Sequence, residues 1–455
     1  MRTGAVALAF VLVLAATPRP ARAQFSLDAR RIGMGGVSLS RDGNLRRYNP
    51  AYRAVKDRPS TGGEPKFTMP VPFGLIKFFK DHPLNQLGSD PTFDPKSSAF
   101  NPFELMNTIF NPPIFYEVKE APTPTNDVEF TIGRDTLIIN LHEARVLIPE
   151  QEFGLGGTSR LLDAGFGVKG FRFSVQGFEN HDVAFLLGDE LRAFLRDTVT
   201  ADTNTTYNVL GDGLVQAGFA PTLSFSGRLT GVGSDTDDGV YLGAAVRAYY
   251  GAAYFRAVGS GGFTTGDTLF AGSNPVTPQL DALIYRAHDV GKTFGHGFGG
   301  DVGVVFISGP FEVGVGANDI GADLTWKDTR IDSTYFDTVG DSIVTTLVRN
   351  HVETTTKLPV TYIANAAIRM GTGTTLGADI VNSGRGTVIH VGGEQRLGML
   401  ALRGGVSRDQ RKKMQFGLGG GVRLGPLGLD VGFWTHSNSF ANKRGITMAT
   451  SISIY

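Results

Sequence analysis

The chain has 455 residues, no cysteine and equal numbers of acidic and basic residues, so its formal net charge is zero. A neutral chain argues against nucleic acid as a partner, because nucleic-acid-binding proteins carry a basic surface. Without cysteine there are no disulfides, no thiolate metal ligands, no cysteine nucleophile and no lipid-modified cysteine. The 61 glycines are nearly double the average usage, and glycine suits tight turns and crowded interiors.

Residues 1–23 have the features of a secretory signal peptide. Arg2 gives a positive start, and Ala5–Ala16 is an apolar core too short to span a bilayer. Ala21–Ala23 fits a cleavage site, so we expect a mature chain that begins at Gln24. An uncleaved membrane anchor is the alternative. No later stretch approaches the ~18 apolar residues of a membrane helix, so a membrane form would have to be a closed barrel of strands.

Two segments follow without strand alternation. Residues 24–58 are short and rich in glycine. Residues 59–153 are rich in proline and phenylalanine, and we expect them to form loop and one short helix, Pro102–Phe110, at the mouth of a barrel. So much aromatic surface must be buried, which makes it a candidate ligand-binding surface. The candidate ligand-lining residues are Phe73, Phe78, Phe79, Phe103, Met106 and Phe110.

From residue 154 to residue 455 the sequence predicts antiparallel strands. Apolar residues alternate with glycine and polar residues, for example over 164–176, 240–249 and 311–316. Roughly one strand per ~20 residues gives about 14 strands, with an even number expected. Three polar stretches alternate less regularly, and we expect them to be extracellular loops, the last with a small hairpin of its own. They are residues 192–208, 257–292 and 318–357.

The last hundred residues contain three hairpins with short turns on one side and longer loops on the other. This asymmetry, with strands of 8–11 residues, is typical of bacterial transmembrane β-barrels, whose short turns are periplasmic. A soluble β-sandwich also alternates, but its polar face would carry more lysine, threonine and glutamate. The expected turns are Gly371–Gly373, Gly398 and Gly425–Pro426, and the expected loops are Asn382–Thr387, Ser407–Lys413 and His436–Gly445.

Charged residues in these strands fix which face is inside. An arginine on the lipid face costs ~2–4 kcal/mol at the midplane, so we expect the charged side chains to face the lumen. Tyr455 is out of phase with the apolar stripe of the last strand, and the sequence gives no reason for this. The predicted lumenal charges are Glu312, Arg369, Asp379, Glu394, Arg403, Arg423 and Asp430.

The segment Ala29–Val55 contains a GMGG turn and an Asn-Pro-Ala motif. With Leu400–Val406 and Phe416–Phe433, it resembles the FadL-like outer-membrane transport proteins and their PorV/PorQ-like and TraF-like relatives. The resemblance covers about the first 30 mature residues and the last hundred. It departs from the family at Asn44–Arg47 and in the long insert after residue 58. The matching positions are Ala29, Arg30 or Arg31, Gly33, Gly35, Gly36, Asn49, Pro50 and Ala51.

The resemblance implies a 14-stranded barrel with an N-terminal plug, or hatch, in its lumen. In that family, hydrophobic ligands enter near the extracellular loops and leave by a lateral opening or by movement of the hatch. The hatch is expected to use Arg31, Gly33, Gly35, Gly36, Asn49, Pro50 and Ala51. Two alternatives stay open for its arginines: they pair with lumenal carboxylates, or they face periplasmic water. These arginines are Arg30, Arg31, Arg41, Arg46 and Arg47.

Other motifs predict neither a cofactor nor a metal site. The GxGxxG pattern at Gly295–Gly300 precedes a strand and not a helix, so it is not a dinucleotide motif. Asp235–Gly239 resembles part of a calcium loop but lacks the closing glutamate. The eight histidines form no ligand pair, and His390 is expected in a structural network with lumenal charges. No serine and histidine mark an esterase, and we predict that the protein is not an enzyme.

Three functions fit these observations. The first is an outer-membrane barrel for uptake or passage of small hydrophobic compounds, surrounded by outer-membrane lipid. The second is a non-transporting outer-membrane scaffold that binds secreted or secretion-system proteins, as PorV-like proteins do. The third, a general porin, is disfavoured because a plug would block open diffusion.

Overall fold

The computed structural model confirms the predicted all-β, antiparallel fold. Most of the described residues belong to strands, and none of the helices among them is long and apolar enough to cross a membrane. The candidate ligand-lining residues, the helix expected at Pro102–Phe110, and residues 1–23 lie outside the described residues. The structure describes residues 28–39, 43–56, 67–70, 127–132, 135–140, 153–195, 200–231, 237–268, 276–288, 293–340, 342–371, 373–384, 386–410, 414–435 and 446–455.

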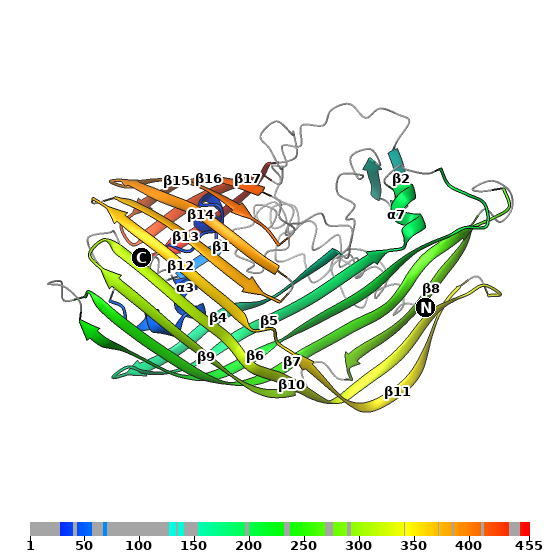
Figure 1. Cartoon of the computed structure of the whole chain (residues 1–455), viewed down its shortest axis with the longest axis horizontal. Coiled ribbons are helices and arrows are strands. Elements are labelled where there is room, and N and C mark those ends of the chain that lie inside the picture. Colours follow the sequence, from blue (N-terminus) through cyan, green and yellow to red (C-terminus); the bar gives the residue numbers. More distant parts are fainter. Residues whose placement is uncertain are drawn as a thin grey trace, which may run out of the picture.

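One antiparallel sheet of sixteen strands dominates the described part of the chain, and β1 and β4 are its two edges (Figure 1). A separate hairpin joins β2 (Asp127–Ile132) to β3 (Asp135–Asn140). The sheet contains β1 (Phe67–Pro70), β4 (Phe153–Val168), β5 (Phe171–Leu187), β6 (Thr206–Gly231), β7 (Gly239–Thr265), β8 (Val276–Ala287), β9 (Gly295–Ser308), β10 (Phe311–Asp337), β11 (Ser342–Lys357), β12 (Thr361–Met370), β13 (Thr374–Ser383), β14 (Gly386–Leu397), β15 (Leu400–Arg408), β16 (Met414–Leu424), β17 (Leu427–Thr435) and β18 (Ile446–Ile454).

The sixteen strands occupy fourteen positions across the sheet, which accounts for the predicted number. β8 pairs with the second half of β7 and β9 with its first half, so β8 and β9 share one position. In the same way β11 and β12 share the position beside β10. At each of these two positions, two consecutive strands follow one another in the same direction, like a single strand with an interruption.

The two sides of the sheet differ greatly in strand length. Strands β12 to β18 have 9–12 residues. By contrast β6 has 26 residues, and β7 and β10 have 27 each. The longer strands of the other side extend well past the ends of the short ones (Figure 1). We call β4–β11 the long-stranded half and β12–β18 the short-stranded half.

The expectation of irregular loops at 257–292 and 318–357 is wrong, because strands fill most of both, but the hairpin expected in the second is present as the pairing of β10 with β11. Residues 257–292 contain the end of β7 and all of β8, and residues 318–357 contain most of β10 and all of β11. The sequence pattern does not reveal these strands, because threonines face each other across them where an apolar stripe would be expected. At Thr334–Thr345, for example, the two hydroxyls lie 3.1 Å apart. The loop expected at Asn382–Thr387 shortens to a turn between Ser383 and Gly386. Residues 192–208 contain the end of a helix, α7 (Asp189–Leu195), and the start of β6.

The insert that we expected to be loop and one helix contributes three strands in its described part, β1, β2 and β3. β1 pairs with the last strand, β18, over Phe67–Pro70. The sheet therefore begins before residue 154, the start that the sequence pattern gave for it.

The outer face of the sheet is apolar, whereas the inner face combines glycines and buried polar groups with two buried apolar clusters. Large apolar side chains are exposed on both halves; Phe298 is 71% exposed and Leu418 63%. The residues that alternate with them are glycines and buried polar groups, such as Gln415 on β16 and Arg247 on β7. An apolar exterior with polar groups in the interior is the reverse of a soluble protein and is the pattern of a lipid-facing wall.

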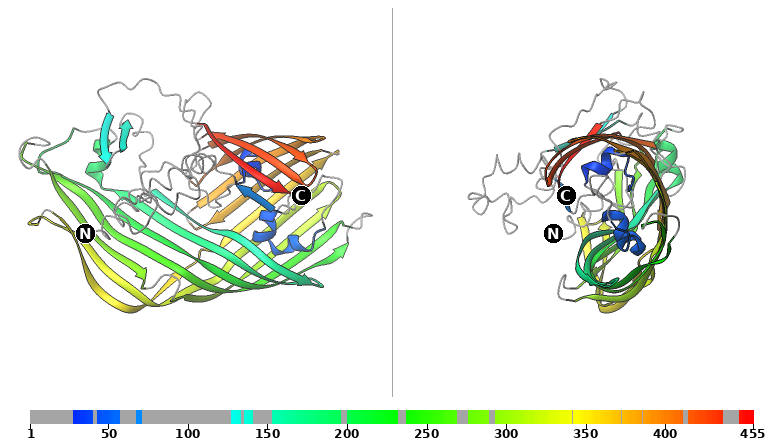
Figure 2. Two further views of the ribbon diagram at one scale, coloured as in Figure 1. Left: turned by 180° about the vertical axis from the view of Figure 1, so that it is seen from behind. Right: turned by 90° about the vertical axis from the view of Figure 1, so that its left-hand side faces the viewer.

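The concave face of the sheet holds the N-terminal segment, by which we mean residues 28–39 and 43–56. It contains α2 (Ala29–Gly33), α3 (Gly43–Tyr48) and the 3-10 turn η1 (Pro50–Arg53), drawn in blue inside the curved sheet in Figure 2. α2 lies against β15–β18, and η1 lies against β6, β7 and β9.

Glycines on the inner face explain how the segment comes so close to the strands. A Cβ on Gly33 would lie 2.8 Å from the Cα of Gly419, closer than Cβ contacts in proteins. Gly405 and Gly417 face the backbone of residues 32–35 with no more room. Much of the unusual glycine content of the strands therefore serves the close approach of two backbones.

Candidate functional site: contacts between the N-terminal segment and the sheet

A chain of buried ion pairs joins α2 to the short-stranded half. Arg30 Nε donates to Glu394 Oε2 at 3.0 Å, and Arg403 Nε donates to the same oxygen at 2.6 Å. Arg403 Nη1 also lies 2.7 Å from Asp430 Oδ1. All four side chains are almost completely buried. Of the two alternatives for the arginines, Arg30 follows the first and pairs with a carboxylate.

The GMGG turn lies against a second polar group. Asp379 accepts a hydrogen bond from the backbone N of Ser38 at 2.7 Å and lies 2.5 Å from His390 Nδ1. Gly36, which has a φ of 94°, leaves room for the His390 ring, since a Cβ there would lie 2.7 Å from His390 Cδ2. His390 thus belongs to a structural network, as expected, with Asp379 as the partner described here. Arg31 Nη2 donates to the Gly36 carbonyl at 2.7 Å and closes the turn.

The Asn-Pro-Ala motif joins the N-terminal segment to the long-stranded half. Asn49 Oδ1 accepts from the N of Ala51 at 3.0 Å, which caps η1, and Pro50 occupies the first position of that turn. Asn49 Nδ2 donates to the carbonyls of Val304 at 3.2 Å and Val315 at 3.0 Å. One fully buried amide therefore caps a turn and binds two neighbouring strands, which explains why asparagine occupies this position.

The first half of β4 lies inside the molecule. We call residues 156–160 the inner segment of β4; all are buried, whereas residues 164–168 of the same strand are exposed. One edge of the inner segment pairs with β5. Along the other edge, Gln410 bonds both backbone groups of Gly156, at 3.4 and 2.8 Å, and Ser383 Oγ accepts from the N of Thr158 at 3.1 Å.

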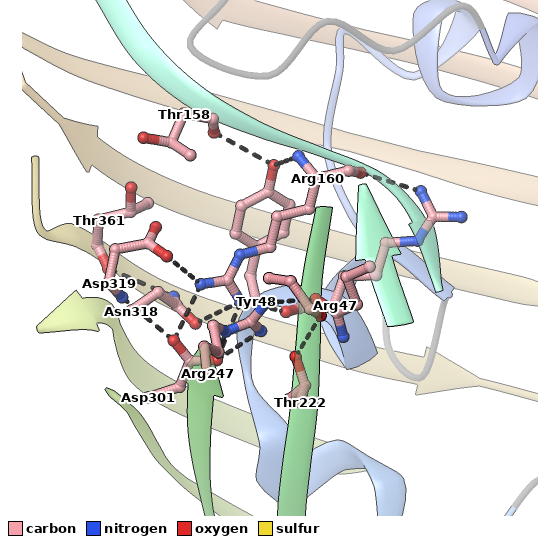
Figure 3. Close-up of polar contacts among 12 residues, drawn as sticks. Arg47, Tyr48, Thr158, Arg160, Thr222, Arg247, Asp301, Asn318, Asp319 and Thr361 are labelled. Carbon is pink, nitrogen blue, oxygen red and sulfur yellow. Dashed lines mark hydrogen bonds and ion pairs between the residues drawn. The ribbon is translucent and has the colours of Figure 1, made fainter. Parts of the chain in front are cut away.

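Tyr48 continues this edge (Figure 3). Its hydroxyl donates to the Thr158 carbonyl at 3.4 Å and accepts from the N of Arg160 at 3.2 Å. Arg47 Nη1 donates to the Arg160 carbonyl at 3.4 Å. Side chains thus occupy the hydrogen-bonding groups that a neighbouring strand would otherwise use, and the edge is covered. Burial raises the pKa of Tyr48, against the opposing effect of the Arg160 charge.

Beside the inner segment lies a buried arginine–aspartate network, which we define as Arg160, Arg247, Asp301 and Asp319 (Figure 3). Arg160 Nη2 lies 2.9 Å from a carboxylate oxygen of each aspartate. Arg247 Nε donates to Asp301 Oδ2 at 2.7 Å. The network has two charges of each sign, so it is neutral, and none of its side chains is more than 3% exposed.

Several neutral groups complete the network. Arg160 Nη1 donates to Asn318 Oδ1 at 3.0 Å and to the Arg47 carbonyl at 2.6 Å, and Tyr249 donates to Asp319 at 2.5 Å. Asp319 has a φ of 60°, at the point where the pairing of β10 with β9 shifts register. A positive φ is uncommon outside glycine, and here a β-bulge aims the carboxylate at Arg160.

An aromatic cluster lies next to this network on the inner face of the long-stranded half. It includes Phe178, Tyr249, Tyr254 and Trp326. Tyr254 stacks on Trp326 with centroids 5.1 Å apart, and Phe178 meets Tyr249 edge-on at 5.3 Å. A Cβ on Gly295 would lie 2.6 Å from the Trp326 ring, so glycine there makes room for the indole. Trp326 Nε1 donates to Thr356 at 3.0 Å, which satisfies its only polar atom.

The structure places the predicted residues as follows. The hatch residues Arg31, Gly33, Asn49, Pro50 and Ala51 are buried, and Gly35 and Gly36 are half-buried. Of the predicted lumenal charges, Glu312, Asp379, Glu394, Arg403 and Asp430 are buried, and Arg369 lies 4.0 Å from Glu312. Arg423 is half-buried with its guanidinium 4.1 Å from the centre of the Tyr455 ring, and this contact accounts for the phase of Tyr455. Arg41 lies outside the described residues.

Sequence reasoning missed the arginine–aspartate network and the aromatic cluster. Arg247 was visible as a charge opposite an apolar stripe, but Arg160, Asp301 and Asp319 had no pattern that linked them. Arg53 was also missed; its Nη2 lies 2.9 Å from Asp163, and burial lowers its pKa to about 10 against the effect of that carboxylate. Among the described residues no group of three histidines, aspartates or glutamates is placed to hold a metal ion.

The chain was compared with known proteins. No protein-family model matches it, and no curated protein matches it. Among solved structures it is similar to the Ralstonia pickettii toluene transporter TbuX, at 11% identity and a TM-score of 0.31, covering 68% of this chain and 91% of that one. For the Pseudomonas putida toluene transporter TodX the identity is 13% and the TM-score 0.31, covering 67% and 88%.

A Rhodopseudomonas blastica porin variant also matches, at 12% identity and a TM-score of 0.20, covering 62% of this chain and 100% of that one. The all-β architecture of this chain follows from its own strand pairing. The resemblance of the chain to the FadL-like outer-membrane transport proteins rests on its sequence motifs.

Proposed function

We propose that this chain forms an outer-membrane barrel through which small hydrophobic compounds pass. The observation that carries the proposal is the position of the aromatic cluster, on the inner face of a wall whose outer face is apolar. Elsewhere the inner face carries glycines, buried charges and a second apolar cluster, which includes Val305 and Ile307 and packs against the N-terminal segment. Flat apolar rings gathered at one inner position suit an apolar guest more than an ion or a sugar.

The membrane part of the proposal rests on the exposed side chains. Exposed phenylalanine, leucine and valine side chains occur on both halves, and extended exposed apolar surface marks a site of membrane or protein contact. The proposed organisation follows the sequence: a cleaved signal at residues 1–23, a plug at 24–58, an insert at 59–153 and a barrel at 154–455, to which β1 is added. Outer-membrane lipid is then the partner of the outer face.

The experiment measures uptake of radiolabelled toluene and of a labelled fatty acid by cells with and without the gene. Equal uptake in both would contradict the proposal. Trp326→Ala is the informative variant, since it removes the largest ring of the cluster. Phe298→Ala is its matched control, because this ring is exposed on the outer face. We expect the first variant to lower uptake and the second to leave it unchanged, at equal amounts of protein in the outer membrane.

A second candidate function is a scaffold for secreted or secretion-system proteins. The observation in its favour is the projection of the long-stranded half, since β6, β7 and β10 have some fifteen residues more than the ~9–11 that a membrane strand needs. Such a one-sided wall offers a surface outside the membrane. Co-purification of the detergent-extracted protein with a secreted protein, combined with unchanged hydrocarbon uptake, would favour this function over transport.

A further inference from the structure

Arg160 connects strands that lie far apart along the sheet. It belongs to β4 at one edge of the described sheet, and its guanidinium binds Asp301 on β9 and Asp319 on β10. Neighbouring Thr158 bonds Ser383 at the end of β13, farther along still. The inner segment of β4 therefore stays paired with β5 along one edge, while its other edge and the Arg160 side chain reach across the concave side of the sheet (Figure 3).

The arginine–aspartate network is dry. The Arg160, Asp301 and Asp319 side chains are each 1% exposed, and Arg247 is 3% exposed. Charges so far removed from water are stable only when each is paired, and here every charge has an opposite charge at hydrogen-bond distance. The Arg160 guanidinium contacts groups on three elements. These are one aspartate on β9, the other aspartate and the Asn318 amide on β10, and the Arg47 carbonyl of the N-terminal segment.

We infer that the inner segment of β4, fixed by Arg160, closes the long-stranded half to ions. The N-terminal segment supports this closure from one side through Tyr48 and Arg47, and the guanidinium fills the space between β4, β9 and β10. The inference rests on the proposed membrane location, but it is independent of the compound that is transported. It assigns to Arg160 a role in excluding ions from a pathway for neutral molecules.

The test is the conductance of the purified full-length protein in planar lipid bilayers in 1 M KCl. Arg160→Ala removes the guanidinium and leaves Asp319 without its arginine, so water enters with the uncompensated carboxylate. We expect the mean conductance per inserted protein to rise at least about tenfold over the unsubstituted protein. Asp301 keeps Arg247 as its partner in this variant.

Two further proteins make the result decisive. Arg160→Ala with Asp319→Asn removes one charge of each sign; it also opens the space but is less destabilised, so it decides the matter if the single variant does not fold. Arg256→Ala is the matched control, because Arg256 pairs with Asp212 at 2.8 Å on the same sheet, with both side chains at least 40% exposed. We expect its conductance to stay within about twofold of the unsubstituted protein, since an exposed ion pair excludes no water.

Flotation with vesicles and resistance of the folded barrel to unheated SDS are measured first. If the double variant folds and inserts but its conductance is unchanged, the inference is wrong and the proposed function still stands. A large permanent conductance of the unsubstituted protein would overturn it as well. Failure of the unsubstituted protein to float with lipid would overturn the proposed membrane location, and the inference with it.

Discussion

The short-stranded and long-stranded halves bind the same N-terminal segment by different means. Against the short-stranded half, α2 is held by ion pairs that involve Arg30, Glu394 and Arg403, and glycines let the backbones touch. Against the long-stranded half, the segment is held by the neutral Asn49 amide, by Tyr48 and by one less deeply buried ion pair, Arg53–Asp163, while the most deeply buried charges lie in the sheet itself. Fully buried ion pairs fix one end of the segment, whereas hydrogen bonds to backbone, with one partly exposed ion pair, fix the other.

This difference teaches that the two contacts should fail in different ways. Loss of an ion-pair partner leaves an unpaired charge buried, which costs more than the loss of a neutral hydrogen bond. The contact of the N-terminal segment with the short-stranded half should therefore be more sensitive to single substitutions than its contact with the long-stranded half.

The largest effect is expected for Glu394→Gln. The Glu394 carboxylate accepts from Arg30, Arg396 and Arg403, and its neutralisation removes a negative charge that these three arginines share, two of them almost completely buried. We expect a loss of about 3–5 kcal/mol in the free energy of unfolding, measured by urea titration in lipid vesicles. Asp212→Asn, in the exposed pair of the long-stranded half, is the control and should cost less than about 1 kcal/mol. Equal effects of the two substitutions would contradict the comparison.

Next comes Asn49→Ala, which removes two hydrogen bonds between the N-terminal segment and the long-stranded half and the one that caps η1. At about 1 kcal/mol each, we expect a loss of about 2–3 kcal/mol in the free energy of unfolding. Asn382→Ala is a matched control, because the Asn382 amide bonds Thr387 on the exposed surface. The comparison would need revision if Asn49→Ala cost more than Glu394→Gln.

A somewhat smaller effect is expected for Gly405→Ala. The new methyl group would overlap the Met34 carbonyl and lie 2.9 Å from the N of Gly35, so the GMGG turn must shift. We expect a loss of about 1–3 kcal/mol, measured in the same titration. Gly404→Ala, one residue earlier, meets nothing closer than 3.8 Å and should be nearly neutral. Similar losses in both would show that the glycines do not serve close approach.

The smallest effect is expected at the exposed start of β6, in the long-stranded half. Thr206→Val removes one exposed hydrogen bond to Thr264, with the hydroxyls 2.9 Å apart. Because valine is a good strand former and both groups reach water, we expect a change within about 0.5 kcal/mol. A loss above that range would mean that the threonine ladders stabilise the long strands much more than exposed hydrogen bonds normally do.

The sequence predicted the short-stranded half better than the long-stranded half. In strands β12–β18 apolar residues alternate strictly with glycine and polar residues, because one face of each strand meets apolar surroundings and the other does not. This periodicity locates the strands in the sequence. β11 carries threonine on both faces and β8 carries a charge on each face, and such strands lack the clean apolar stripe that would distinguish them from loops. The turns at Gly371–Gly373, Gly398 and Gly425–Pro426 were predicted correctly, since glycine with a positive φ marks each of them.

The candidate site was predictable only where a local motif carries it. The Asn-Pro-Ala motif indicated Asn49. The free-energy cost of placing a charged side chain against lipid indicated that Glu394 and Arg403 face inward. Arg160 could not be found in this way, because its role depends on β4 bending inward to meet β9 and β10, which is not encoded by any neighbouring residues. The six candidate ligand-lining residues between Phe73 and Phe110 stay a prediction.

The most direct measurement uses the absence of cysteine. Single cysteines placed in turn at residues 414–424 of β16 can be spin-labelled in the vesicle-inserted protein, and their access to oxygen and to a water-soluble nickel chelate compared. We expect a period of two, with labels at Leu418 and Val422 reached by oxygen from lipid and the label at Gln415 reached by neither reagent. Labels at Leu418 and Val422 reached mainly by the nickel chelate would show that the apolar face meets water, and would contradict a lipid-facing wall with the N-terminal segment inside.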